Sequence, residues 1–248
     1  MEVQIAVAKI NKYAVSESGD TLEVVERPHG GLSVVLADGQ SSGRGAKAIS
    51  MMVVRKVISL LAEGVRDGAA ARAASDALYA EKGGKVSSTL NIASLDMLTR
   101  SIVLTRNNPC PVLVAHNTDV KELVGEGKSI GTQRNSRPLI DEIPVELGLT
   151  VVFFSDGLVH AGERRGTPMN PKTQLLDLLS KENPSAQSIA DSLLANAINL
   201  DDGRPVDDCS VVVLKVMPLS GDNARRMHRD FATAAKRESR RRNHNRLR

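Results

Sequence analysis

The chain has 248 residues, of which 41% are hydrophobic and only 2% aromatic. This hydrophobic fraction is enough for a packed core and excludes global disorder, and the scarcity of aromatic residues argues against a surface that binds nucleic acid by base stacking. The net charge of +4 is unevenly distributed, because residues 225–248 hold ten Lys or Arg and two Asp or Glu, whereas residues 1–224 hold 23 basic and 27 acidic residues. The body of the chain is therefore mildly acidic, and the basic character belongs to its last segment.

The cysteines and the N-terminal residues indicate the compartment. Cys110 and Cys209 lie far apart and lack the spacing of a metal site, which fits a reducing environment. The first residues do not resemble a signal sequence, and no apolar run approaches the ~18 residues that a membrane span needs. We therefore expect a cytoplasmic protein that has no membrane partner.

Short runs that alternate or are wholly apolar, bounded by Gly, Pro, Asn or Asp, predict strands in hairpin-like groups. These runs lie at residues 3–10, 21–26, 31–37, 87–95, 101–105, 111–115, 121–124, 149–154 and 211–216. Apolar residues at helical spacing predict helices at residues 44–61, 69–81, 172–181 and 185–200. The stretch that ends at Ile143-Pro144 and the segment 162–171 are expected to be polar connections.

The order of these elements predicts the fold class. Helices come in two pairs and strands in hairpins, rather than in strict β-α-β alternation, which favours an α+β fold with antiparallel sheets covered by helices. No linker divides residues 1–218, so we expect one domain there, followed by a basic, flexible tail at 219–248. Asp67-Gly68, at the end of the first helix, and Asp202-Gly203 are interpreted as ordinary turns.

Acidic residues stand at the ends of three buried-looking strands. Asp38 and Asp156 each follow a strand and precede a glycine, and Asp207 opens the last strand. Since opposite ends of neighbouring antiparallel strands lie at the same edge, these three acids are expected to meet at one rim of a sheet. Clustered carboxylates repel one another unless a cation holds them, and oxygen ligands without His or Cys favour Mg²⁺ or Mn²⁺.

Four motifs in order carry a family resemblance: Ser18-Gly19-Asp20, Ala37-Asp38-Gly39, Phe154-Ser155-Asp156-Gly157-Leu158 and Asp207-Asp208-Cys209-Ser210. In this order and spacing the chain resembles the protein phosphatase 2C-like (PPM) serine/threonine phosphatases. It is more similar to their bacterial branch, which includes the sporulation protein E and stressosome phosphatases. The resemblance spans about residues 18–216.

The resemblance implies an α-β-β-α sandwich of two antiparallel sheets, with two or more Mn²⁺ or Mg²⁺ ions at one edge. By position, Asp38 would bridge the metals and the Gly39 carbonyl would bind one of them. Asp156 and Asp207 would hold the other metal, and Asp20 would reach the second metal directly or through water. Asp38, Asp156 and Asp207 are thus the expected catalytic residues, and a water that bridges the ions would attack phosphorus in line.

Some positions depart from the family pattern. Gln40 stands where some relatives have a histidine, so the proton donor is left open. Lys9 and Lys12 are interpreted as surface lysines rather than a phosphate clamp, and Asp208 has either a metal-assisting or a structural role. Three histidines lie in or beside turns and are not expected to act in catalysis: His29, His116 and His160.

The expected function is hydrolysis of phosphoserine or phosphothreonine on a phosphorylated bacterial regulatory protein, by resemblance an anti-sigma-factor antagonist or a stressosome component. One alternative is a catalytically weak phosphoprotein-binding module of the same fold. Another is a nucleic-acid-associated protein that acts through its tail, where Arg240-Arg241-Arg242 would bind nonspecifically and with steep salt dependence. The sequence leaves the oligomeric state open.

Overall fold

The computed structural model describes residues 1–28, 30–181, 183–219 and 221. His29 and almost all of the basic tail predicted at 219–248 lie outside the described residues. Residues Met1–Pro218 form one compact unit. No helix in the described part of the chain has the length and apolar character needed to cross a membrane.

This compact unit contains ten strands and five α-helices among its described residues. The strands are β1 (Glu2–Ile10), β2 (Asp20–Glu26), β3 (Leu32–Gly39), β4 (Ser88–Asp96), β5 (Ser101–Asn107), β6 (Val112–His116), β7 (Asp119–Leu123), β8 (Leu139–Pro144), β9 (Leu149–Phe154) and β10 (Cys209–Met217). The helices are α1 (Gly43–Ala62), α2 (Asp67–Lys82), α3 (Gly157–His160), α4 (Pro171–Lys181) and α5 (Ala186–Leu200), with a 3₁₀ turn, η1 (Glu163–Arg165).

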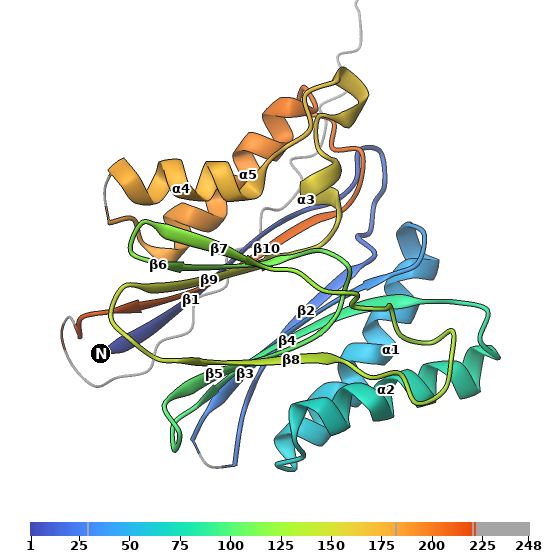
Figure 1. Ribbon diagram of the computed structural model, residues 1–248. Helices are drawn as coiled ribbons and strands as arrows, with labels where there is room; N and C mark the ends of the chain where they lie inside the picture. The colour runs from blue at the N-terminus through green and yellow to red at the C-terminus, as the bar shows by residue number, and fades with distance from the viewer. Residues whose placement is uncertain (29, 182, 220, 222–248) are drawn as a thin grey trace, which may run out of the picture. The chain divides into compact units, whose positions relative to one another are not determined.

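These elements form four layers. The first sheet has the strand order β1-β10-β9-β6-β7 and the second sheet β2-β3-β4-β5-β8, with antiparallel pairing throughout. Figure 1 shows α4 and α5 over the outer face of the first sheet and α1 and α2 over the outer face of the second. This arrangement confirms the predicted α-β-β-α sandwich of two antiparallel sheets.

The continuous apolar runs are explained by strands that are buried on both faces. Because side chains alternate along a strand, β3 sends Val34 and Leu36 into the core between the sheets and Val35 and Ala37 into the core under α1. In β9, Phe153 likewise enters the core between the sheets, whereas Phe154 enters the core under α4 and α5. The sandwich thus has three apolar cores, and its central strands are rigidly placed by packing on either side.

Two sequence predictions about secondary structure are wrong: one strand was predicted as a loop, and one helix start was predicted as a turn. The stretch before Pro144 is a strand, β8, which pairs with β5 at the edge of the second sheet; its side chains alternate between half-buried and exposed, so its charged residues gave it the appearance of a loop. Asp67 does not end the first helix but begins α2, where its buried carboxylate pairs with Arg27 at 3.0 Å.

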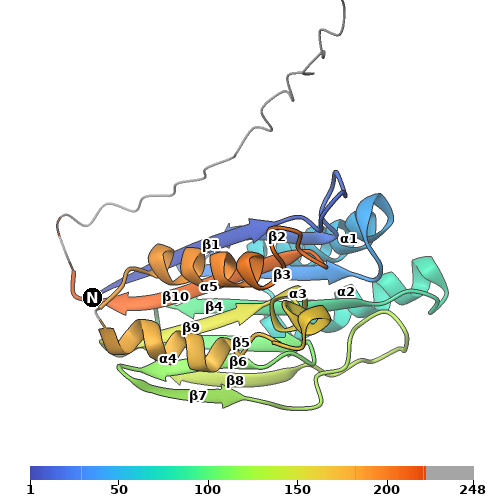
Figure 2. The ribbon, with the colours of Figure 1, turned by 90° about the horizontal axis from the view of Figure 1, so that it is seen from above.

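The acids also meet in a different way from the one expected. Asp38 belongs to the second sheet, whereas Asp156 and Asp207 flank strands of the first sheet. The predicted meeting at the rim of one sheet is therefore wrong, because the acids come together across the two layers. Figures 1 and 2 place α3 and α1, which follow Asp156 and Asp38, toward the end of the sandwich opposite the N-terminus.

Candidate metal centre

Asp20 and Asp38 are direct partners across the β2–β3 pair. In an antiparallel pair, side chains of opposed residues point to the same face and lie about 5 Å apart. Asp20 is completely buried, and Asp38 is partly buried. The second sheet therefore presents two carboxylates side by side at the end of its strands.

One oxygen of Asp20 ties the two sheets together. Its Oδ2 accepts hydrogen bonds from the hydroxyls of Ser155, at 2.8 Å, and Ser210, at 2.5 Å, which belong to the first sheet's β9–β10 region. The Ser155 hydroxyl in turn accepts a bond from the Ser210 backbone N–H, at 2.9 Å. The serine in the Phe154–Leu158 motif thus fixes the position of an acid in the opposite sheet.

The other oxygen of Asp20 is in a different situation. Its Oδ1 is buried and has no hydrogen-bond partner among the described residues. A buried carboxylate oxygen without a donor is costly, and a cation beside it would remove that cost. Asp20 can therefore contribute one oxygen to a metal while the other holds the sheets together.

Asp156 and Asp207 supply the acids of the first sheet. Asp156 follows β9 as the N-cap of α3, and its backbone carbonyl accepts bonds from the N–H groups of Val159 and His160, both at 3.0 Å. Asp207 lies two residues before β10, with a side chain that is 38% exposed. Both carboxylates are therefore less enclosed than that of Asp20.

Asp208 has a structural role. It is buried, and its two oxygens accept bonds from the backbone N–H groups of Lys12, at 2.9 Å, and Gly19, at 2.7 Å. These bonds fasten the loop before Asp20 to the loop that carries Asp207. Of the two roles left open for Asp208, the structure shows the structural one.

Both glycines that follow the motif aspartates are required by close backbone packing. A Cβ atom on Gly39 would lie 2.0 Å from the carbonyl oxygen of Ala46 in α1, and one on Gly157 would lie 2.2 Å from the carbonyl oxygen of Asp208. No side chain fits at either position. The glycines let α1 and the β10 entry come close enough to bring the acids together.

The acids of both sheets act on one another electrostatically. Burial and the negative charges of Asp20 and Asp156 raise the pKa of Asp38 to about 9, and Asp207 contributes in the same direction. Burial and the charge of Asp207 raise the pKa of Asp156, which nearby His160 partly offsets. The structure thus brings all four predicted acids into one interacting group.

The donor set fits a hard divalent cation. Among the residues that the structure describes, no three His, Cys, Asp or Glu side chains are arranged around a single point that could hold an ion. Mg²⁺, however, is usually bound through one or two carboxylates and keeps several waters. The orphaned Oδ1 of Asp20 and the destabilised charge of Asp38 are the features that a bound cation would relieve.

Lysines surround the acidic group. Lys9 is not a surface lysine: its ammonium donates to the Asp20 carbonyl at 2.7 Å, and burial lowers its pKa. Lys47 on α1 donates to the same carbonyl oxygen at 2.8 Å. Lys12 lies 3.9 Å from the carboxylate of Asp207. The sequence motifs did not reveal that Lys47 contacts Asp20, because this contact depends on how α1 packs against β2.

Gln40 and His160 bear on the open question of the proton donor. The Gln40 side-chain oxygen accepts a bond from the Ser87 backbone N–H at 2.9 Å, so this residue joins β3 to the start of β4. His160 is exposed and pairs with Glu163 at 2.9 Å; this bond, together with the charges of Glu163, Asp156 and Asp207, raises its pKa, although desolvation opposes the shift. His116 pairs with Glu146 instead, at 3.5 Å.

The fold and the motifs agree with a family assignment. A sequence model of the stage II sporulation protein E (SpoIIE) family matches residues 28–217, so the chain belongs to the SpoIIE family. It is 21% identical over 206 residues to stage II sporulation protein E of Bacillus subtilis, a match that covers 80% of this chain. The same match covers only 24% of the relative, so the chain spans about a quarter of that protein's length.

Solved structures show the same fold. The PP2C phosphatase domain of Bacillus subtilis SpoIIE, with a fragment of its regulatory domain, superimposes with a TM-score of 0.76 at 20% identity, covering 87% of this chain and 64% of that one. The catalytic domain of the serine/threonine protein phosphatase PstP, solved with two manganese ions, gives a TM-score of 0.67 at 17% identity, covering 87% and 99%. The sandwich is therefore the PP2C fold.

Proposed function

We propose that the chain is a metal-dependent phosphatase that removes phosphate from serine or threonine of a cytoplasmic regulatory protein. The observation that carries this proposal is the electrostatic coupling of four acids from two sheets, Asp20, Asp38, Asp156 and Asp207, at one end of a PP2C fold. Relatives described as a cell fate determinant and as a serine/threonine phosphatase support a phosphorylated regulatory protein as the substrate.

In this proposal the cofactor is Mn²⁺ or Mg²⁺, in two or more ions, held by Asp38 and the Gly39 carbonyl on one side and by Asp156 and Asp207 on the other. Such ions lower the pKa of a water molecule and neutralise charge on the phosphoryl oxygens. Asp20 keeps the two sheets in register through Ser155 and Ser210 and offers its second oxygen to the same site. Solved relatives with manganese in one case and magnesium in another support this choice of cation.

The test is hydrolysis of p-nitrophenyl phosphate and of a phosphoserine peptide by the full chain, with Mn²⁺, with Mg²⁺ and with chelator. We expect metal-dependent turnover that Asp38→Asn and Asp207→Asn abolish. Asp177→Asn, which removes an exposed carboxylate on α4, is the matched control and is expected to keep full activity. Full activity in chelator would overturn the metal-dependent mechanism, and peptide binding without turnover under every metal condition would favour the phosphoprotein-binding module.

A further inference from the structure

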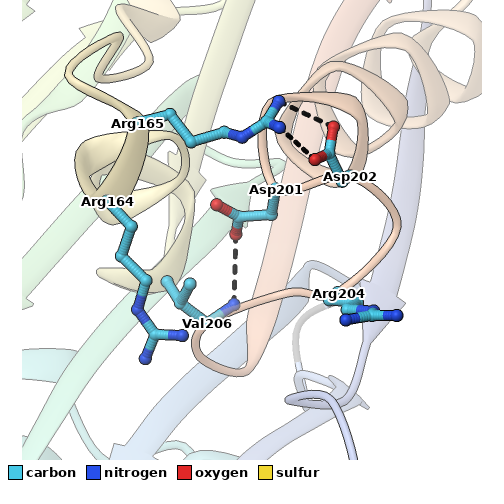
Figure 3. Close-up of a pocket in the computed structure, with 6 residues that line it drawn as sticks. All are labelled: Arg164, Arg165, Asp201, Asp202, Arg204 and Val206. Carbon is cyan, nitrogen blue, oxygen red and sulfur yellow. Dashed lines mark hydrogen bonds and ion pairs between the residues drawn. The ribbon is translucent and has the colours of Figure 1, made fainter.

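A pocket of about 400 Å³ opens between two loops, one of which follows Asp156 and the other of which precedes Asp207. It is lined by Arg164, Arg165, Asp201, Asp202, Arg204 and Val206. Figure 3 shows Arg164 and Arg165 on one segment and the other four residues on a facing loop. The first segment follows Asp156 and α3, and the second runs directly into Asp207.

A buried carboxylate holds the two walls of this pocket in place. The two oxygens of Asp201 accept bonds from the backbone N–H groups of Gly162, at 2.9 Å, and Val206, at 3.1 Å. Arg165 and Asp202 add a two-fold ion pair between the same walls, with one Nη–Oδ distance of 2.7 Å. The pocket is therefore a fixed feature of the fold, and the charges of both its aspartates are already engaged.

Two arginines of the pocket remain available. In the part of the chain that the structure describes, neither Arg164 nor Arg204 has a carboxylate partner. The Arg204 guanidinium lies over the ring of Tyr13, 5.4 Å from its centroid, which orients it without neutralising it. Planar guanidinium groups suit bidentate binding of carboxylates, so these two arginines can each bind an anionic group.

The position of the pocket indicates where that group comes from. Arg204 is three residues from Asp207, so their Cα atoms are at most about 11 Å apart. An extended peptide advances about 3.3 Å per residue. A side chain two to four residues from a phosphorylated residue at the acids can therefore reach the pocket.

We infer that this pocket binds an acidic side chain of the phosphorylated protein, two to four residues from the phosphorylated residue, and so selects substrates by their acidic flank. The inference rests on the proposed phosphatase function, because it places the phosphorylated residue at the four acids. Arg164 and Arg204 are specificity-determining residues, and Arg165 and Asp201 position the walls.

The test compares three fluorescently labelled phosphoserine peptides that differ only at positions two to four from the phosphoserine, with Glu, Gln or Lys there. Binding to the full chain is measured by anisotropy in chelator, so that no turnover occurs. We expect the Glu peptide to bind roughly threefold to tenfold more tightly than the Gln peptide, and Arg164→Gln or Arg204→Gln to reduce this ratio roughly twofold to fivefold. Arg164→Glu should favour the Lys peptide.

Arg55→Gln, which removes an exposed charge from α1, is the matched control and should leave the ratio as it is. The inference about the pocket would be wrong if the ratio of the affinities for the Glu and Gln peptides were the same in the wild type and in Arg164→Gln. It would also be wrong if Arg55→Gln reduced this ratio as much as Arg164→Gln does. Hydrolysis of the Glu and Gln peptides with Mn²⁺ is measured separately. If a preference that depends on Arg164 persists without any hydrolysis, only the phosphatase proposal fails; hydrolysis without that preference overturns only the acidic-flank inference.

Discussion

Asp20 and Asp38 oppose each other on paired strands, whereas Asp156 and Asp207 lie on loops at the ends of β9 and β10. We call these the inner pair and the outer pair. Asp20 is fully enclosed and bonded to the opposite sheet, but the Asp207 side chain is 38% exposed and pairs with Lys12 at 3.9 Å. The inner pair is therefore coupled to the stability of the fold more closely than the outer pair is.

The largest effect expected separates the pairs by activity and stability together. Asp38→Asn and Asp156→Asn should each lower the kcat/KM for p-nitrophenyl phosphate with Mn²⁺ by about a thousandfold, because each removes a charge from the centre. In chelator at neutral pH, Asp38→Asn should raise the Tm, since burial and the neighbouring carboxylates raise the pKa of Asp38 to about 9 and folding must therefore bind a proton there. Asp156→Asn should raise the Tm less, because burial and Asp207 raise the pKa of Asp156 to a smaller extent. Thermal unfolding of the two variants beside the wild type checks this.

If both variants shift the Tm equally, the distinction between the pairs is wrong. Asp177→Asn again supplies the control for the loss of an exposed carboxylate.

The two glycines test whether close packing matters equally on both sides of the site. Gly39→Ala and Gly157→Ala should each destabilise the fold by about 2 kcal/mol or more, because the new methyl group would lie 2.0 or 2.2 Å from a backbone oxygen. Urea unfolding measures the change. Gly45→Ala is the control: a Cβ there has no atom within 4 Å and stands in a helix, so it should stabilise by up to about 1 kcal/mol.

The pH dependence of stability sharpens the comparison for the inner pair. Asp38 has a pKa of about 9 in the folded state, so the native protein binds more protons than the unfolded chain between about pH 4 and pH 9. Stability without metal should therefore fall as the pH rises from 5 to 8, by up to about 4 kcal/mol or roughly 10 °C in Tm. Asp38→Asn should flatten this slope, and Mn²⁺ should restore stability at pH 8.

Thermal scans of the wild type and Asp38→Asn at both pH values, in chelator, measure the slope directly. If the Tm of the wild type rises from pH 5 to pH 8, the raised pKa of Asp38 does not determine how stability depends on pH.

The strands and acids could be predicted because their signals are local. The apolar run of β3 ends in Asp38 within one short segment, and the Ser185 N-cap of α5, which accepts a bond from the Ser188 N–H at 3.1 Å, follows from neighbouring residues. Motif order then placed Asp156 and Asp207 in the same site. The sequence therefore predicts most of the secondary-structure elements and the acids that they carry.

The contacts that assemble the site could not be predicted, because they join residues far apart in the chain. Asp20 bonds to Ser155 and Ser210, which lie 135 and 190 residues away, and nothing in its own motif specifies either serine. The edge strand β8 was missed because a strand with one solvated face and charged residues has the composition of a loop. Arg27 and Asp67 pair only because β2 ends beside the start of α2.

The smallest effect expected concerns the outer pair. Lys12 and Asp207 lie 3.9 Å apart with side chains 34% and 38% exposed, and ion pairs of this kind contribute less than about 1 kcal/mol. Lys12→Ala should therefore change the Tm by no more than about 2–4 °C, while the backbone bond from Lys12 to Asp208 remains. Steady-state hydrolysis with Mn²⁺ should stay within a few-fold of the wild type. A hundredfold loss of kcat/KM would instead indicate that Lys12 binds the phosphate of the substrate. The outer pair would then depend on Lys12, in the loop after β1, as closely as Asp20 of the inner pair depends on Ser155 and Ser210.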